Sequence, residues 1–164
     1  MSFDARQFRT ALAGSPTGVA VVTARADDGT AVGITINSFT SVSLEPPLVL
    51  WSLAKTSPNL AHFAYGRRHI IHVLADHQDE LARRFASRMA DKFSGVRHGD
   101  SEDNIPVFDE CVATFECATR SLYEEGDHVI VVAHVGRLDQ REREPLLFWA
   151  GRFTVLEAVA SSRG

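Results

Sequence analysis

The stretch Thr35-Ile36-Asn37-Ser38-Phe39-Thr40-Ser41-Val42-Ser43-Leu44-Glu45-Pro46-Pro47-Leu48-Val49-Leu50-Trp51-Ser52 sets small hydroxyl and amide side chains before a Pro-Pro turn and an apolar strand. The ordinary interpretation is a strand and a loop whose hydroxyls face water or cap turns. The alternative is a cradle for a phosphorylated ligand, in which hydroxyls and exposed amides hold phosphate oxygens and Asn37 reads a ring edge. The residue types alone leave both interpretations open.

Length and composition describe an ordinary globular protein. The chain has 164 residues, 45% apolar and 23% charged, without a linker, internal repeat or low-complexity tract. A net charge of -4 argues against a general nucleic-acid binder. No apolar run reaches the roughly 18 residues of a membrane span, and the N-terminus lacks the layout of a signal peptide. We therefore expect a single cytoplasmic domain over residues 1–164, with its core from about 8 to 156.

Cysteine and histidine spacing argues against a disulfide or a metal site. Cys111 and Cys117 lie six apart in what reads as one strand, about 20 Å at 3.3 Å per residue, so we interpret both as buried apolar residues. A reactive thiol is the alternative. His69 and His72, three apart on a strand, should point to opposite faces. Because the chain has no HExxH or CxxC pattern, we expect no zinc site.

Three helices are expected. The first covers residues 4–13, with Asp4 as its N-cap and Phe8 and Leu12 sharing a buried face. The second follows Ser57-Pro58 and stops near residue 66. The third is capped by Asp76, and its apolar face repeats at i, i+4 and i+8 through Leu81, Phe85 and Met89.

Strands outnumber these helices. They are expected at residues 19–24, 31–36, 48–53, 70–74, 112–122, 129–138, 146–149 and 152–156. Asp28-Gly29 and residues 124–127 mark hairpin turns, and 97–106 reads as a surface loop. Hairpin spacing favours a mainly β fold, an antiparallel barrel with peripheral helices, over a Rossmann sheet. Since GxGxxG and P-loop patterns are both missing, a dinucleotide would not bind in the Rossmann manner.

Three further segments have both a structural and a functional interpretation. Residues 51–59 end a strand and cap a helix, or hold a phosphate at that helix N-terminus with help from Lys55 and Ser57. Residues 83–93 form an amphipathic helix and its sequel, with a solvated basic face. Gly126-Asp127-His128 is by itself a turn followed by a histidine, and a lone histidine is more often structural than catalytic.

Taken in order, these segments resemble the short-chain flavin reductase family. The matching patterns are T-x-N-S-F-x-S-V-S-x-x-P-P-L from residue 35, R-F-A from 84, D-K-F from 91, G-D-H from 126 and P-L-L-F-x-x-G-x-F from 145. The resemblance extends from about residue 8 to 156. Ala133 stands where the family pattern after G-D-H has glycine, whereas Val135 is kept.

The resemblance implies an FMN-binding split β-barrel, antiparallel and Greek-key-like, usually a homodimer with flavin sites near the subunit interface. It implies hydride transfer from NADH or NADPH to FMN or FAD, with reduced flavin passing to a partner oxygenase. His128 would be the catalytic residue, beside the nicotinamide. The cofactor-binding positions that it implies are Thr35, Ile36, Asn37, Ser38, Ser41, Val42, Ser43, Trp51, Ser52, Leu53, Lys55, Ser57, Phe85, Lys92, Gly126, Asp127 and His128.

Three rival functions remain. A non-enzymatic flavin-binding protein for storage or sensing could use the same barrel, because fold alone does not decide function. A split-barrel oxidase of the pyridoxamine-phosphate type would place its phosphate-gripping basic residues in a different order, and the T-x-N-S and G-D-H segments speak against it. An interaction module without a cofactor would bind no flavin.

Overall fold

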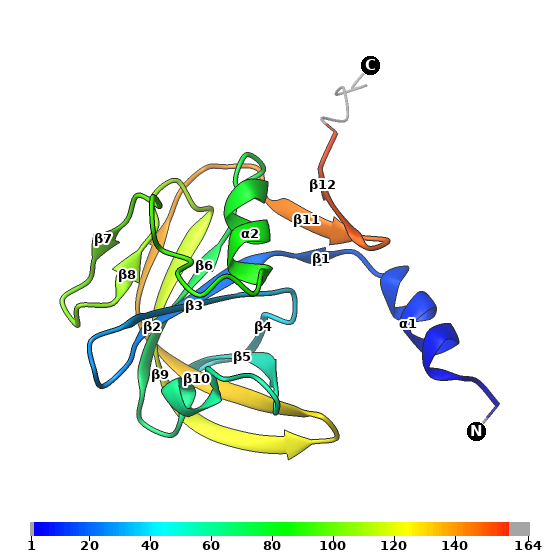
Figure 1. Cartoon of the computed structure of the whole chain (residues 1–164), viewed down its shortest axis with the longest axis horizontal. Coiled ribbons are helices and arrows are strands. Elements are labelled where there is room, and N and C mark those ends of the chain that lie inside the picture. The colour runs from blue at the N-terminus through cyan, green and yellow to red at the C-terminus, as the bar shows by residue number, and fades with distance from the viewer. Residues whose placement is uncertain (1, 158–164) are drawn as a thin grey trace.

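A computed structural model describes residues 2–157, which form mostly antiparallel β-structure (Figure 1). Its largest sheet has seven antiparallel strands in the order β3-β2-β6-β9-β10-β5-β4. The strands are β2 (Ala20–Arg25), β3 (Ala31–Ile36), β4 (Thr40–Leu44), β5 (Pro47–Ala54), β6 (Arg68–Val73), β9 (Ala113–Glu125) and β10 (His128–Gln140). The predicted hairpins at Asp28-Gly29 and at 124–127 are confirmed.

The two edge strands of this sheet, β3 and β4, are neighbours in the sequence. Residues 37–39 join them, and β3 also contacts β5, so the sheet curls into a barrel that is split between β3 and β4. The hydroxyl-rich stretch quoted above therefore spans the split. This arrangement confirms the predicted β-barrel with peripheral helices.

Smaller elements complete the fold. A three-stranded sheet contains β1 (Thr17–Gly18), β11 (Leu146–Trp149) and β12 (Arg152–Val155). A two-stranded ladder pairs β7 (Gly99–Asp100) with β8 (Pro106–Val107), inside the segment predicted to be a surface loop. The helices are α1 (Ala5–Ala13), α2 (Asp79–Ala86) and the 3-10 turn η1 (Leu60–Phe63). No helix within residues 2–157 is long and apolar enough to cross a membrane.

Alternation along the strands divides the buried residues into two cores, because successive side chains of a strand point to opposite faces. On β2, Val22 enters the inner core of the barrel, whereas Val21 enters an outer core covered by α2. Trp51 and Phe63 pack edge to face in the inner core, with ring centroids 4.8 Å apart. Phe85 of α2 is the corresponding anchor of the outer core.

The prediction that His69 and His72 point to opposite faces is confirmed. His69 lies in the interior, where its Nε2 accepts a hydrogen bond from Trp51 Nε1 at 3.4 Å. His72 lies on the outer side, where its Nε2 accepts from the main-chain N–H of Phe108 at 3.2 Å, so its Nδ1 donates to the carbonyl of Val21 at 3.0 Å. Both imidazoles are fully buried, and burial lowers the pKa of each to about 4.

Both cysteines are free and buried, as predicted. Burial raises the pKa of the Cys111 thiol to about 11 and that of Cys117 to about 12, so both are protonated at neutral pH. Cys111 nevertheless precedes β9, which begins at Ala113, so the prediction that one strand holds both cysteines is wrong.

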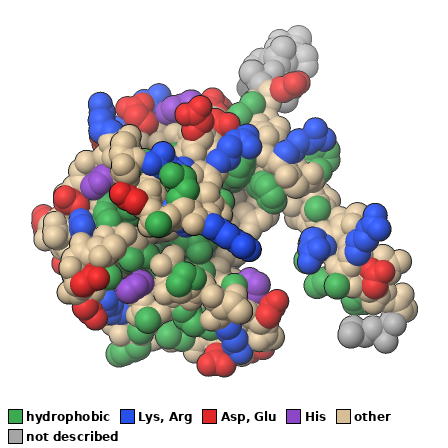
Figure 2. All heavy atoms as spheres, viewed as in Figure 1, with side chains coloured by type: hydrophobic (Ala, Val, Ile, Leu, Met, Phe, Trp, Pro, Cys, Tyr) green, Lys and Arg blue, Asp and Glu red, His purple; other side chains and the backbone are tan. Residues whose placement is uncertain are grey.

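Helix α1 begins as predicted and packs differently. The Asp4 side chain accepts from the N–H of Gln7 in a complete capping box. Phe8 and Leu12, however, are 53% and 59% exposed, and no residue of α1 is buried against the rest of residues 2–157. The predicted burial of this face is wrong for a single chain. Instead α1 extends from the barrel as an arm (Figures 1 and 2).

The other helix predictions need correction. No α-helix starts at Pro58: the segment holds only the four-residue turn η1. Helix α2 begins at Asp79 with Gln78, not Asp76, as its N-cap, and it ends at Ala86. Met89 consequently lies beyond the helix and is 49% exposed.

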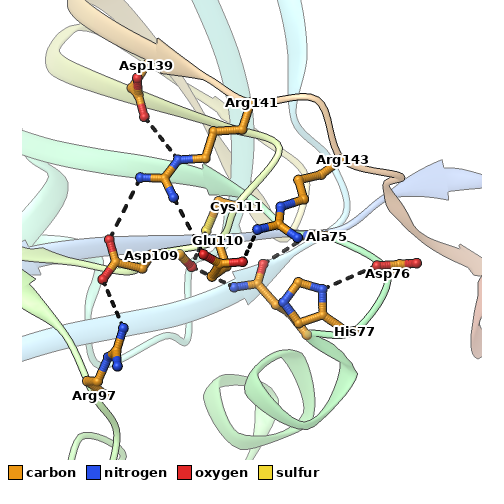
Figure 3. Close-up of polar contacts among 11 residues, drawn as sticks. Ala75, Asp76, His77, Arg97, Asp109, Glu110, Cys111, Asp139, Arg141 and Arg143 are labelled. Atoms are coloured by element: carbon orange, nitrogen blue, oxygen red, sulfur yellow. Dashed lines mark hydrogen bonds and ion pairs between the residues drawn. The ribbon is translucent and has the colours of Figure 1, made fainter.

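Where β9 begins and β10 ends, three carboxylates lie among three arginines, and one of them, Asp139, pairs with Arg141 at 3.6 Å (Figure 3). Asp109 pairs with Arg97 at 3.6 Å and with Arg141 at 3.9 Å, and Glu110 pairs with Arg141 at 3.7 Å and with Arg143. These groups are largely exposed, where single ion pairs contribute about 0–1 kcal/mol each. The cluster joins the segment before β9 to the connection between β10 and β11.

Candidate functional site

A cleft of about 1150 Å³ opens on the outer side of β3. It is lined by residues 30–35, by residues 56–59 and by residues 85–93, which end α2 and continue beyond it. Thr35, Ser57, Phe85 and Lys92 all line it, so the fold brings together candidates from three sequence segments. Ligand clefts commonly measure about 300–1,000 Å³, so this one has room for a nucleotide.

Gly33 of β3 lines the cleft at the point where α2 packs against the strand. A Cβ atom at this position would lie 2.4 Å from Cε1 of Phe85, so only glycine allows α2 to approach β3 this closely. Two residues along the same face, the Thr35 hydroxyl donates to the carbonyl of Ala82 in α2 at 2.6 Å. The helix is thereby fixed to the strand by one close contact and one hydrogen bond.

Lys92 forms part of the far wall. Its Nζ donates to the carbonyl of Phe85 at 2.9 Å and approaches that of Gly33 at 3.5 Å. Partial burial lowers the pKa of the Lys92 ammonium below its ordinary value. The predicted cofactor-binding lysine therefore lies at the cleft with its ammonium held by main-chain oxygens.

The segment from Thr56 to Asn59 forms the opposite lip without the predicted helix. Ser57 Oγ accepts from the main-chain N–H of Asn59 at 3.2 Å, and the Ser57 N–H donates to the carbonyl of Ala54 at 2.9 Å. Because η1 is a single 3-10 turn, this segment has no α-helix N-terminus whose dipole could hold a phosphate. What remains at this lip is the Ser57 hydroxyl itself.

The middle of the first segment closes the split instead of lining the cleft. Ser38 Oγ accepts from the N–H of Ser52 at 2.9 Å, which ties the β3–β4 connection to β5. Asn37 is exposed beside it. The remaining candidates, Ser41, Val42 and Ser43, lie on the edge strand β4, and Val42 is 48% exposed.

Three predicted cofactor-binding side chains point into the barrel. Ile36, Trp51 and Leu53 are 7%, 0% and 3% exposed and belong to the inner core. The indole of Trp51 packs on Phe63 and His69. These side chains therefore support the wall from inside and do not line the cleft, and the part of these positions in holding a cofactor stays a prediction.

Gly126, Asp127 and His128 form the turn between β9 and β10. Gly126 has φ 58°, a left-handed backbone angle that glycine adopts readily. His128 Nδ1 lies 2.7 Å from Asp127 Oδ1, and this hydrogen bond lowers the pKa of the Asp127 carboxyl. His128 is not among the cleft residues of the single chain.

Lys55 connects this turn with the cleft lip. Its main-chain N–H donates to the carbonyl of Asp127 at 2.9 Å, one residue before Thr56 enters the cleft. Its side chain pairs with Glu124 at 3.0 Å and so turns toward the hairpin. The predicted phosphate contact of Lys55 has a competitor in that carboxylate.

The sequence interpretation missed Gly33, His62 and Arg88, all of which line the cleft. Gly33 carried a readable signal, since a glycine inside an apolar strand often marks close backbone approach. His62 and Arg88 carried none, because the turn that holds each of them lacks a regular pattern.

The chain forms an antiparallel split barrel with a nucleotide-sized cleft against one edge strand, a design found among flavoproteins. The family model for the flavin reductase like domain matches residues 12–157. The chain therefore belongs to the flavin reductase family.

Individual relatives agree over most of the chain. It is 42% identical over 150 residues to FMN reductase (NADH) SmoA of Agrobacterium fabrum, covering 92% of this chain and 85% of that protein. It is 38% identical over 157 residues to HsaB, the reductase subunit of a flavin-dependent monooxygenase from Rhodococcus jostii, covering 95% and 80%. The structure of the NADH:FAD oxidoreductase SgcE6 from Streptomyces globisporus, solved with NAD and FAD fragments, superposes with a TM-score of 0.89 at 38% identity, covering 96% and 95%.

Proposed function

We propose that this chain reduces flavin with NADH and serves as the reductase component of a two-component flavin-dependent monooxygenase. The observation that carries the proposal is the single cleft that gathers Thr35, Ser57, Phe85 and Lys92. The relatives named as an NADH-dependent FMN reductase and as a monooxygenase reductase subunit support the same reaction. Family membership and the cleft thus favour catalysis over mere flavin storage.

The cleft fits a flavin nucleotide chemically. Ser57, Arg88 and Lys92 offer hydroxyl and cationic groups suited to a phosphate, and the exposed side chain of Met89 supplies apolar surface. We propose that the cleft residues Thr35, Ser57, Phe85 and Lys92 form the flavin site of one chain, and that Asn37, Ser38 and Ser52 extend it along the split beside the cleft. Ser41, Val42, Ser43 and Lys55 lie outside this cleft, and we propose that they adjoin the flavin of a second copy.

Bound flavin and NADH supply the hydride chemistry themselves, so the chain needs no nucleophile. Its contribution is to hold the two reactants in register and to keep water out. The Asp127 carboxylate accepts from His128 Nδ1, which leaves Nε2 to orient the nicotinamide amide or to hold a proton. We propose His128 as the catalytic residue on this basis, with Gly126 and Asp127 as its supports.

We propose further that the protein is a homodimer. The apolar face of α1 is exposed in a single chain, and so are Leu44 at 94% and Tyr123 at 54%. We propose that the second copy which covers these surfaces also places its G-D-H turn beside the cleft. Charge complementarity supports the same proposal: Arg6 and Arg9 give α1 positive charge, and in the dimer they would face the acidic turn at Glu124 of the second copy.

NADH over NADPH and a cytoplasmic location are also proposals. SmoA and SgcE6 are both named for NADH. Cell fractionation tests the location. The rates of NADH oxidation with FMN and with FAD decide which flavin the protein prefers.

The test is steady-state oxidation of NADH and of NADPH with FMN, FAD and riboflavin in turn, followed by fluorescence quenching for flavin affinity. We expect turnover with NADH and a flavin that dissociates readily, because reduced flavin must leave for the oxygenase. Flavin binding without turnover would favour the storage or sensor protein, and no flavin binding would contradict both.

A further inference from the structure

Two cationic side chains brace the wall of the cleft against each other. Arg84, near the end of α2, donates from Nε to the carbonyl of Lys92 at 2.6 Å and from Nη2 to the carbonyl of Ser94. Lys92 in turn donates to the carbonyls of Phe85 and Gly33. Each side chain thus grips the main chain beside the other, and we call this pair the Arg84–Lys92 brace.

The braced segment, residues 87–93, has no regular secondary structure. Asp91 Oδ1 accepts from the N–H groups of Phe93 and Ser94 at 3.1 and 3.0 Å, which closes a local turn. The Phe93 ring then packs edge to face on Phe85, 4.9 Å between centroids. The start of the wall is also tied to α2, because the N–H and Oγ of Ser87 both donate to the carbonyl of Arg84. Toward its end, at Lys92, the brace supplies the polar ties to α2 and β3.

The brace also concentrates positive charge. Neither Arg84 nor Lys92 has a carboxylate within 4.0 Å among residues 2–157; their partners are neutral carbonyls. The planar guanidinium of Arg84 spans two carbonyls two residues apart, a geometry that a single ammonium lacks. The wall therefore presents cationic charge to the cleft from a fixed position.

We infer that Arg84 is a positioning residue of the flavin site. It holds Lys92 and the wall at 87–93 against Gly33, and this sets the width of the cleft and the place of the Lys92 charge. Arg84 itself is absent from the cleft lining, so it acts through Lys92 and the wall. This inference rests on the proposed function.

The test compares Arg84→Met, Arg84→Lys and Lys92→Met with Arg83→Met. Arg83 is the matched control, because this neighbouring guanidinium pairs with Asp79 on the exposed face of α2. Because the substitution removes two charge-assisted hydrogen bonds that hold the wall, Arg84→Met should raise the flavin Kd and the KM for flavin about tenfold or more. Saturating flavin should restore kcat to within about twofold, and Arg84→Lys should be intermediate.

In the double variant Arg84→Met/Lys92→Met, the flavin Kd should rise by less than the product of the two single rises. The reason is that each side chain acts through the wall that the other also holds. A Kd for Arg84→Met equal to that for Arg83→Met, with only a lower melting temperature, would overturn the positioning role. An unaltered chain that binds no flavin would overturn the proposed function, and the inference with it. If flavin binding and turnover are the same in Arg84→Met as in the unaltered chain, the inference fails and the proposed function stands.

Discussion

Gly33 shows how one missing methyl group shapes the site. Ala at this position would place its Cβ 2.4 Å from the Phe85 ring, which is itself fully buried and fixed by Phe93 and Phe108. Because the ring cannot yield cheaply, we expect Gly33→Ala to lower the free energy of unfolding by about 1–3 kcal/mol and to weaken flavin binding. Urea denaturation and flavin fluorescence quenching measure the two effects.

Gly99→Ala is the control for this substitution. A Cβ at Gly99 meets nothing within 4 Å, and its φ is not in the left-handed region. It should leave flavin affinity unchanged. Equal behaviour of the two variants would mean that the contact between β3 and α2 does not set the cleft.

His128 can be tested against a histidine in the same local setting. His77 is also exposed and pairs with the preceding aspartate, at 3.2 Å from Asp76, but it lies outside the G-D-H turn. We expect His128→Ala to slow hydride transfer about 10-fold to 100-fold with little change in flavin Kd, and His77→Ala to change neither. Stopped-flow absorbance gives the transfer rate. An unchanged rate in His128→Ala would remove its catalytic assignment.

At the scale of elements, most strands and the ends of α1 were predicted from the sequence, whereas the other two helices were not predicted correctly. Strand β4 was not among the predicted ranges, but the other strands of the large sheet, both hairpin turns and β11 lie close to them, because period-2 alternation and Asp-Gly turns are local signals. The helix at Pro58 was wrong since a Ser-Pro start is only a cap signal. The residues that follow, Leu60 and Phe63, sink into the barrel as a single 3-10 turn.

The site could be predicted from the sequence only in part, because local patterns do not show which face of a strand is interior. Strand alternation separates Thr35 and Ser52 from Ile36, Trp51 and Leu53, yet only the tertiary fold says which face is interior. Residue types and family resemblance located the segments, whereas the brace depends on main-chain carbonyls that no sequence pattern marks. That one domain spans residues 1–164 stays a prediction.

Strand β6 makes stability depend on pH. Its His69 and His72 titrate near pH 4 when folded and near 6.5 when unfolded, so between these values the unfolded chain binds more protons. Stability should therefore be full above pH 6.5 and fall as the pH drops toward 4, with a loss of roughly 2 kcal/mol per histidine by pH 5. Urea unfolding at pH 7, 6 and 5 measures this fall.

His72→Gln identifies the source of that fall. Glutamine can donate and accept as the neutral imidazole does toward Val21 and Phe108, but it does not titrate. The variant should lose less stability between pH 7 and 5 than the unaltered chain. If the two chains lose the same amount, His72 does not carry the effect.

At the scale of the whole molecule, the arm is the feature that a single chain leaves without a role. Trp149 Nε1 donates to the carbonyl of Gly14 at 3.2 Å, and the Ala150 N–H donates to that of Ala13 at 3.0 Å. These bonds fix the end of α1 to the β11–β12 turn, so the helix is held away from its own barrel (Figure 1). An amphipathic helix held in this way needs cover from another molecule.

We therefore expect Phe8→Glu and Leu12→Glu to shift the protein from dimer to monomer, because each puts a charge on the face that the second copy would bury. Thr10→Glu is the control, since Thr10 lies on the opposite side of α1 from Phe8 at 100° per residue. Both substituted positions are exposed in a single chain, so the monomer should keep its fold by circular dichroism. Sedimentation velocity measures the mass of the particle in solution.

If the flavin site needs both copies, NADH oxidation should fall as the dimer dissociates. A dimer that survives Phe8→Glu and Leu12→Glu together would show that the arm does not hold the copies, and a monomer that keeps full activity would show that one chain contains the whole site.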